Sequence, residues 1–195
     1  MNRRHLLGTL LALPLFAACS SGTKAFQNTD LTPAGVFPKL ELTDGDGKVR
    51  QMNEFSGKVV IVFFGFTRSP DSSPSALRKY ASLIRSLRSI DSKRVQLLFI
   101  TLDPKRDAPQ HADTFAQWFH PEFIGLGGSP AQINSLAEQF DVTFSKKNTS
   151  PTDYSIEYAA DAYVIDPKGQ LRLRAALSSP IEHITEDMLL LLDEK

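Results

Sequence analysis

The stretch KVVIVFFGFTRSPDSSPSAL (Lys58–Leu77) decides the fold. Its first part, KVVIVFFGF, is a nearly continuous run of β-branched and aromatic residues, which is typical of a strand covered on both faces. A polar turn with two Ser-Pro pairs follows, and the spacing of Leu77, Tyr80 and Ile84 then predicts a helix. A buried strand that leads into a helix N-terminus is a common place for a reactive group, yet this turn carries none.

The rest of the chain continues the alternation of strands and helices. We expect a hairpin around Asp44–Gly47, further helices and strands, a polar loop over 146–158, a second hairpin and a C-terminal helix. The expected ranges are hairpin arms within 37–52, helices at 74–90, 109–119, 130–140 and 180–192, strands at 95–103 and 123–128, and a hairpin at 162–177. This order predicts one α/β domain with helices packed on a mixed central sheet.

The N-terminal residues are typical of an export signal. A basic MNRRH is followed by the apolar run LLGTLLALPLF and by AAC, which ends at Cys19. The run is shorter than the roughly 20 residues needed to span a bilayer, so we interpret 1–18 as a signal peptide. LFAAC resembles a bacterial lipoprotein signal, which implies a lipid on Cys19 and a membrane-anchored protein facing the periplasm or the cell exterior. The alternative is an ordinary signal peptide cut near Ala18.

The polar residues after the cysteine divide the exported chain into two parts. We expect a tether over 19–35, because it is polar and contains Pro and Gly, and a folded domain over 36–195. The formal net charge is zero, which argues against a nucleic-acid partner. Cys19 is the only cysteine, so the chain can form no internal disulfide.

Four blocks of sequence resemble the Sco/SenC family of copper-handling, cytochrome-oxidase assembly proteins. They are GFTRSPDSSPSAL (65–77), TLDPKRDAP (101–109), FHPEFIGLGGSPAQI (119–133) and DYSIEYAADAYVIDPKG (153–169). The resemblance runs from about Phe37 to the C-terminus. It implies a thioredoxin-like fold, to which the N-terminal hairpin is an addition.

The resemblance also implies a copper site, and this chain departs from it at every ligand position. The two family cysteines fall on Ser69 and Ser73, and the family histidine falls on Tyr158. Copper(I) selects thiolate and thioether ligands, and a hydroxyl cannot form a disulfide. We therefore expect no copper cofactor, no thiol–disulfide exchange and no catalytic residue. Deliberate replacement of cysteines by serine would not explain Tyr158, so we favour a natural, divergent relative.

The serines have structural roles of their own. Ser73 followed by Pro74 predicts an N-cap with proline at the first helical position. Ser69-Pro70-Asp71 suits a turn, with the Asp71 carboxylate near the helix N-terminus. We expect Arg68, Pro70 and Asp71 to form a loop that faces a partner.

Other ligands and other chemistries stay open as alternatives. Met52 or a histidine could hold copper in place of the family ligands, although core filling is the commoner fate of methionine. Asp103 and Asp107 could hold a hard cation, and Asp44–Gly47 a calcium ion, but turn stabilisation is the simpler role of both. A new serine-based enzyme would need a base, and the candidates are His5, His111, His120 and His183.

The function that follows is a binding or assembly role without enzymatic activity. The resemblance implies a protein partner, either an oxidase subunit or a Sco-type relative that keeps its metal ligands. A copper chaperone with substitute ligands is the alternative, and the serine-based enzyme is the least favoured.

Overall fold

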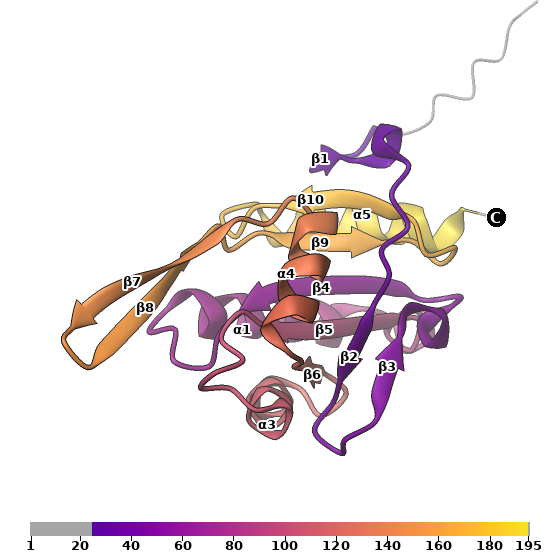
Figure 1. The fold of residues 1–195 in the computed structure, drawn as a ribbon. Helices are drawn as coiled ribbons and strands as arrows, with labels where there is room; N and C mark the ends of the chain where they lie inside the picture. Colours follow the sequence, from indigo (N-terminus) through magenta and orange to yellow (C-terminus); the bar gives the residue numbers. More distant parts are fainter. Residues whose placement is uncertain (1–24, 195) are drawn as a thin grey trace, which may run out of the picture.

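The computed structural model describes residues 25–194, so the expected signal peptide and Cys19 lie outside the described residues. The first and the last strand of the described chain pair with each other at one edge of the central sheet (Figure 1). They are β1 (Thr29–Asp30), η1 (Thr32–Ala34), β2 (Glu41–Thr43), β3 (Val49–Gln51), η2 (Met52–Phe55), β4 (Val59–Gly65), α1 (Ser72–Ser86), α2 (Ser89–Ser92), β5 (Val95–Thr101), α3 (Pro109–Phe119), β6 (Ile124–Leu126), α4 (Pro130–Gln139), β7 (Phe144–Ser150), β8 (Asp153–Tyr158), β9 (Ala162–Ile165), β10 (Leu171–Ala175) and α5 (Ile181–Asp193).

The central sheet is mixed, as the sequence predicts. Its strand order is β1-β10-β9-β4-β5-β6, in which β4, β5 and β6 are parallel and β9 runs antiparallel to β4. Val62 of β4 lies between Leu98 of β5 and Tyr163 of β9, so β4 is a fully paired central strand. The predicted N-terminal hairpin is confirmed as β2 and β3, which form a separate two-stranded sheet.

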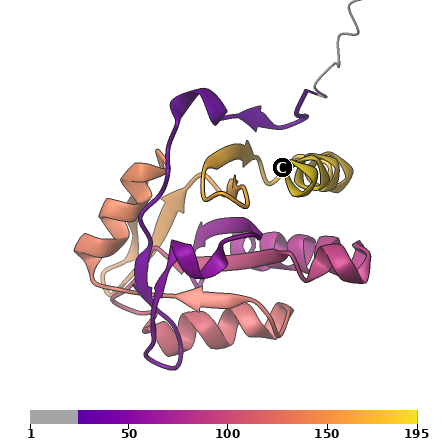
Figure 2. The same ribbon diagram turned by 90° about the vertical axis from the view of Figure 1, so that its right-hand side faces the viewer.

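Helices cover both faces of the sheet, because β4 sends alternate side chains to two separate apolar cores. Val59, Ile61 and Phe63 pack on the side of α1, α3 and α5. Val60, Val62 and Phe64 pack on the side of α4 and the β2–β3 hairpin. Figure 2 shows these two layers on opposite sides of the strands. Burial on both faces explains why the β4 sequence is apolar throughout rather than alternating.

One predicted element is wrong. The range 146–158, expected to be a polar loop, contains most of the antiparallel hairpin β7–β8, which projects from the body in Figure 1. The two strands pair with each other and do not join the central sheet. Most of β7 is therefore exposed, and its polar sequence carries no buried face that would have indicated a strand.

The N-terminal segment is held in place by a buried carboxylate on the last helix. Asp187 accepts hydrogen bonds from the backbone N–H groups of Gln27 and Asn28, at 2.8 and 2.9 Å, and from the Asn28 side chain at 2.8 Å. Strand β1 then pairs with β10. The range that we expected to be a tether, 19–35, therefore includes residues with fixed contacts from Gln27 onward.

Within residues 25–194, no helix combines the length and the apolar character that crossing a bilayer requires.

Candidate functional site

The candidate site lies where β4 ends and α1 begins. Gly65 closes β4, and a Cβ at this position would lie 2.5 Å from Ser73 Oγ and 3.0 Å from the rings of Phe63 and Phe99. The absence of a side chain at Gly65 is therefore what lets the first turn of α1 approach the strand.

The start of α1 differs from the prediction. The helix begins at Ser72 with Asp71 as its N-cap residue, so Ser73 is the second helical residue and not the cap. Ser69 takes over part of that role, because its Oγ accepts the backbone N–H of Ser73 at 3.2 Å. The predicted placement of Asp71 at the helix N-terminus is confirmed, and its carboxylate accepts the Ser75 hydroxyl at 3.0 Å. Ser69, which lies four residues before Ser73, therefore caps one N–H group in the first turn of α1.

The three positions that the family resemblance assigns to metal ligands meet in space. Ser73 Oγ and the Tyr158 phenol oxygen are 3.0 Å apart, joined by a hydrogen bond in which either hydroxyl can donate. Ser73 Oγ also accepts the backbone N–H of Phe66 at 3.2 Å. Ser73 is fully buried and Ser69 nearly so. Ser73 and Tyr158 thus bond to each other, and the hydroxyl oxygens of Ser69 and Ser73 accept adjacent backbone N–H groups.

The environment of Tyr158 keeps its phenol protonated. Burial raises the pKa of Tyr158 above its usual value, and the hydroxyls of Ser73, Ser69 and Ser72 oppose this only in part. The ring packs edge-on against Phe66, with 6.0 Å between ring centroids. At neutral pH the site therefore presents neutral hydroxyl groups and no anionic donor.

A second carboxylate fixes the loop between β4 and α1. Asp107 accepts the backbone N–H of Thr67 at 2.8 Å, the Thr67 hydroxyl at 2.5 Å and the Thr101 hydroxyl at 2.8 Å. Its side chain is buried, and each of these bonds stabilises the turn. The structure thus favours turn stabilisation over a cation site for this aspartate.

The neighbouring Asp103 links the site to the β7–β8 hairpin, a connection that the sequence analysis missed. Its carboxylate forms an ion pair with Arg106 Nε and accepts the Tyr154 hydroxyl at 2.7 Å. The Arg106 guanidinium lies 3.7 Å from the centroid of the Tyr154 ring and also pairs with Asp153 at 2.9 Å. A signal was available: Tyr154, Ile156 and Tyr158 alternate with polar residues, which is the period of a strand.

The alternative ligands and bases do not gather at the site. Met52 precedes the start of β4, whereas Ser69 follows its end, and seven strand residues separate the two by about 20 Å. Met52 packs against the core on the α4 side, as the core-filling interpretation predicts. His120 stacks on Phe123, and His111 and His183 lie on α3 and α5. Across residues 25–194, no hydrogen bond joins a histidine to Ser69 or Ser73, and no group of three or more His, Cys, Asp or Glu side chains is arranged to hold a metal ion.

The predicted partner-facing loop is accessible. Arg68, Pro70 and Asp71 are exposed, whereas Ser69 between them points inward and is buried. The loop therefore exposes one cation, Arg68, and one carboxylate, Asp71, beside the buried hydroxyl groups of Ser69 and Ser73.

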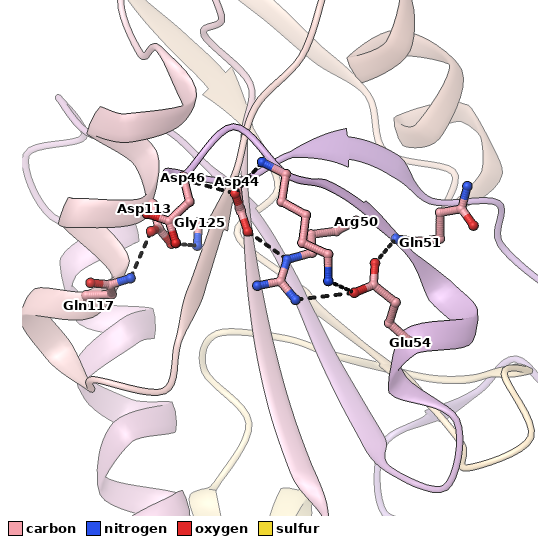
Figure 3. Close-up of polar contacts among 9 residues, drawn as sticks. Asp44, Asp46, Arg50, Gln51, Glu54, Asp113, Gln117 and Gly125 are labelled. Carbon is pink, nitrogen blue, oxygen red and sulfur yellow. Dashed lines mark hydrogen bonds and ion pairs between the residues drawn. The ribbon is translucent and has the colours of Figure 1, made fainter.

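A second polar cluster joins the β2–β3 turn to α3 (Figure 3). Asp44 accepts the backbone N–H groups of Asp46 and Lys48 and the Nε–H of Arg50. Burial alone would raise the pKa of Asp44, but Arg50 and these N–H groups outweigh it and lower the pKa. Its oxygens are thus engaged in the turn, as the Asp-Gly interpretation predicts.

Asp113 of α3 lies against that turn and has the opposite titration behaviour. It accepts the backbone N–H of Gly125 at 2.8 Å and the Gln117 side chain at 2.8 Å. Burial raises the pKa of Asp113, and the nearby charges of Asp44 and Asp46 raise it further. A Cβ on Gly45 would collide with this carboxylate, so the turn packs directly on it.

A mixed sheet with helices on both faces, and a polar site at the junction of a central strand and a helix, define a thioredoxin-like α/β protein. The SCO1/SenC family matches residues 29–193, and the chain belongs to that family. The crystal structure of Arabidopsis thaliana ScoI with copper bound superposes with a TM-score of 0.74 at 29% identity, covering 80% of this chain and 98% of that one.

Two named relatives agree with this assignment. Protein sco1 of Schizosaccharomyces pombe is 36% identical over 180 residues, covering 83% of this chain and 68% of the relative. Protein SCO1 homolog 2 of Arabidopsis thaliana is 28% identical over 155 residues, covering 80% of this chain. The alignment spans 56% of the length of that mitochondrial relative.

The donor set at the three ligand positions does not fit copper(I). Two alcohols and a phenol held protonated by burial are hard, weak donors, whereas the soft ion selects sulfur. Their hydrogen bonds to one another would have to break before any of them could turn toward a metal.

Proposed function

We propose that this protein is a Sco-family binding or assembly factor that acts without copper, without thiol–disulfide exchange and without catalysis. The observation that carries the proposal is the hydrogen-bonded group of Ser69, Ser73 and Tyr158 at the positions of the family ligands. These hydroxyl groups bond to each other or to the backbone of the loop and stabilise it, and none of them supplies the thiolate or imidazole that would hold copper(I). What remains available is the exposed surface around that loop.

The decisive experiment is a titration with copper(I) in competition with a chelator. It compares the parent protein with the variant Ser69→Cys/Ser73→Cys/Tyr158→His, both carrying Cys19→Ala so that no other thiol is present. We expect the triple variant to take up one ion per chain and the parent to take up none. The double variant Ser69→Cys/Ser73→Cys should bind more weakly than the triple variant, because it lacks the imidazole.

Two outcomes would contradict this reading of the three positions. One is a parent protein that holds one copper ion per chain against the chelator. The other is a triple variant that is folded, as judged by circular dichroism, and yet binds no better than the parent. The first outcome would favour copper handling through substitute ligands.

The partner is proposed to be a protein, either an oxidase subunit or a Sco-type relative with intact metal ligands. Sco proteins have been described as cytochrome c oxidase assembly proteins, which supports this choice. The exposed loop residues Arg68 and Asp71 beside the site are the proposed contact. We expect Arg68→Glu to weaken co-purification with such a partner, while Lys93→Glu, at the exposed residue that follows the short helix α2, should not. Equal capture of both variants would exclude the loop as the contact.

We further propose that a lipid on Cys19 holds the protein at a membrane on the exported side, because LFAAC resembles a lipoprotein signal. Two or more acyl chains are enough for stable anchoring. Cys19→Ala should move the protein from the membrane fraction to the soluble fraction of the exported compartment. Membrane retention of that variant would favour another form of attachment.

A further inference from the structure

A hollow of about 730 Å³ lies between the loop after β5, the first half of α4 and the start of β7. In Figure 1 the base of the projecting hairpin lies beside α4. The walls are largely apolar, formed by Leu102, Pro104, Pro130, Ile133 and Phe144. This volume lies within the range of about 300 to 1,000 Å³ that small-molecule sites occupy.

The charges at the hollow are of one sign. Lys105 and Lys146 are among its lining side chains, and among the described residues no carboxylate lines it. Both lysines are exposed, and neither forms an ion pair with another residue of the described range 25–194. Lys146 Nζ lies 4.5 Å from the centroid of the Tyr154 ring. The nearby acids Asp103 and Asp153 are already paired with Arg106.

The first turn of α4 adds little further polar capacity. Ser129 and Gln132 form a reciprocal cap, in which Ser129 Oγ accepts the Gln132 N–H and Gln132 Oε1 accepts the Ser129 N–H. The unpaired charge of the hollow therefore comes from the two lysines. Lys105 lies in the loop after β5, and Lys146 lies on β7.

A second hollow on the same side of the sheet provides a comparison. It has a similar volume, about 660 Å³, and lies between β2, η2 and α4. Its lining contains one cation and one anion, Lys39 and Glu41, together with amide side chains. Two of these amides already bond to the backbone: Gln139 accepts the Lys39 N–H, and Gln132 donates to the Glu41 carbonyl. Similar size with balanced charge makes it a control site.

We propose that the hollow beside β7 binds a small organic anion with an apolar body, such as a medium-chain carboxylate. The apolar walls would cover the body of the ligand, and Lys105 and Lys146 would pair with its anionic group. Ion pairing is stronger at the edge of an apolar hollow than in open water, because the local dielectric is lower. The neighbouring hairpin carries Tyr158, so the ligand would lie on the same structural unit as the candidate site.

The experiment uses the full chain and the fluorescent probe 8-anilinonaphthalene-1-sulfonate, which is an apolar ring system with one sulfonate. We expect saturable binding of one probe per chain, displaced by decanoate. Decanol has a similar apolar body without the charge and should displace the probe about tenfold less well or worse. Lys105→Glu/Lys146→Glu should weaken probe binding by about tenfold or more, because two attractive charges become repulsive.

The matched control is Lys39→Glu, which reverses one lysine at the charge-balanced hollow and should leave probe affinity unchanged. Phe144→Ala tests the apolar wall without any change of charge and should weaken both probe and decanoate. Unchanged affinity in the double lysine variant would overturn the proposal. So would equal weakening by Lys39→Glu, or equal displacement by decanol and decanoate. Circular dichroism of each variant shows that the fold is retained.

Discussion

The phenol oxygen of Tyr158 lies 3.0 Å from Ser73 Oγ, and this hydrogen bond joins the first turn of α1 to a hairpin 85 residues further along the chain. Neither residue could perform the chemistry of a thiolate or an imidazole. Together they join the start of α1 to strand β8 through neutral hydroxyl groups.

The strength of this contact can be measured with a double-mutant cycle. Tyr158→Phe and Ser73→Ala should each lower the free energy of unfolding by about 1 kcal/mol or more, because each removes a hydrogen bond from a buried partner. The double variant should lose less than the sum, with a coupling energy of about 0.5–1.5 kcal/mol in denaturant titrations. Strict additivity would mean that the two hydroxyls do not interact.

The close approach of β4 and α1 predicts that Gly65 tolerates no side chain. Gly65→Ala would place a methyl group 2.5 Å from Ser73 Oγ and 3.0 Å from two phenylalanine rings. We expect a loss of about 1–3 kcal/mol in the free energy of unfolding, as for other overpacked cores. Gly57→Ala meets no atom within 4 Å and has only its positive φ of 82° to oppose it, so it separates steric collision from backbone strain. A Gly65→Ala protein as stable as the parent would contradict the packing.

The pairing of Arg106 with Asp103 predicts that the hairpin depends on this arginine. Arg106→Ala leaves the buried Asp103 without its counter-ion and removes the cation from the Tyr154 ring. We expect a loss of about 3 kcal/mol, since removing one partner of a buried pair is costly. Hydrogen exchange should rise first in β7 and β8. Uniform exchange across the whole domain would show that Arg106 does not act on the hairpin.

The raised pKa of Asp113 predicts that the variant Asp113→Asn is more stable than the parent protein at neutral pH. Its pKa is raised above 3.8, so the folded protein holds this proton more tightly than the unfolded chain does. Stability therefore falls as the pH rises from 3.8 through the folded pKa, and at neutral pH the ionised Asp113 is a cost. Asp113→Asn removes that cost, and its amide oxygen can still accept the Gly125 N–H. We expect a higher Tm at pH 7, with the difference disappearing below about pH 4.

Asp44→Asn serves as the control of opposite sign. The pKa of Asp44 is lowered, so its contribution to stability is present above 3.8 and is lost as the pH falls through the folded pKa. This variant should lower the Tm at pH 7 and approach the parent in acid. The same sign of change in both variants would contradict the assignment.

The sequence predicts the central strands and the helices well, because their signals are local. The continuous apolar run of β4 reflects burial of both faces of the strand. The helical spacing after Pro74 reflects burial of one face of α1. The start of α1 is displaced by two residues, since Asp71 and Ser73 are both good cap residues and the chain pairs Ser69 with the Ser73 N–H. Such boundaries depend on side-chain geometry that the sequence does not contain.

The sequence was enough to identify the residues of the candidate site, but not to predict the contacts among them. Ser69, Ser73 and Tyr158 were identified by resemblance to a family, and the contact between Ser73 and Tyr158 is a tertiary feature. The hairpin that carries Tyr158 was missed because Lys146, Lys147 and Asn148 give β7 no apolar face. Its partner strand β8 contains the alternation, and Ile156 on that face is buried in the core on the α4 side.

The hydrogen bonds that Asp187 accepts from Gln27 and Asn28 fix the N-terminal segment against α5, and this position has a consequence for the proposed lipid anchor. Eight steps along the chain separate Cys19 from Gln27, and a fully extended chain covers at most about 28 Å in that number of steps. A lipid on Cys19 would thus keep the α5 edge of the domain within about one protein diameter of the bilayer. With such an anchor, we expect the domain to meet its partners close to the membrane surface.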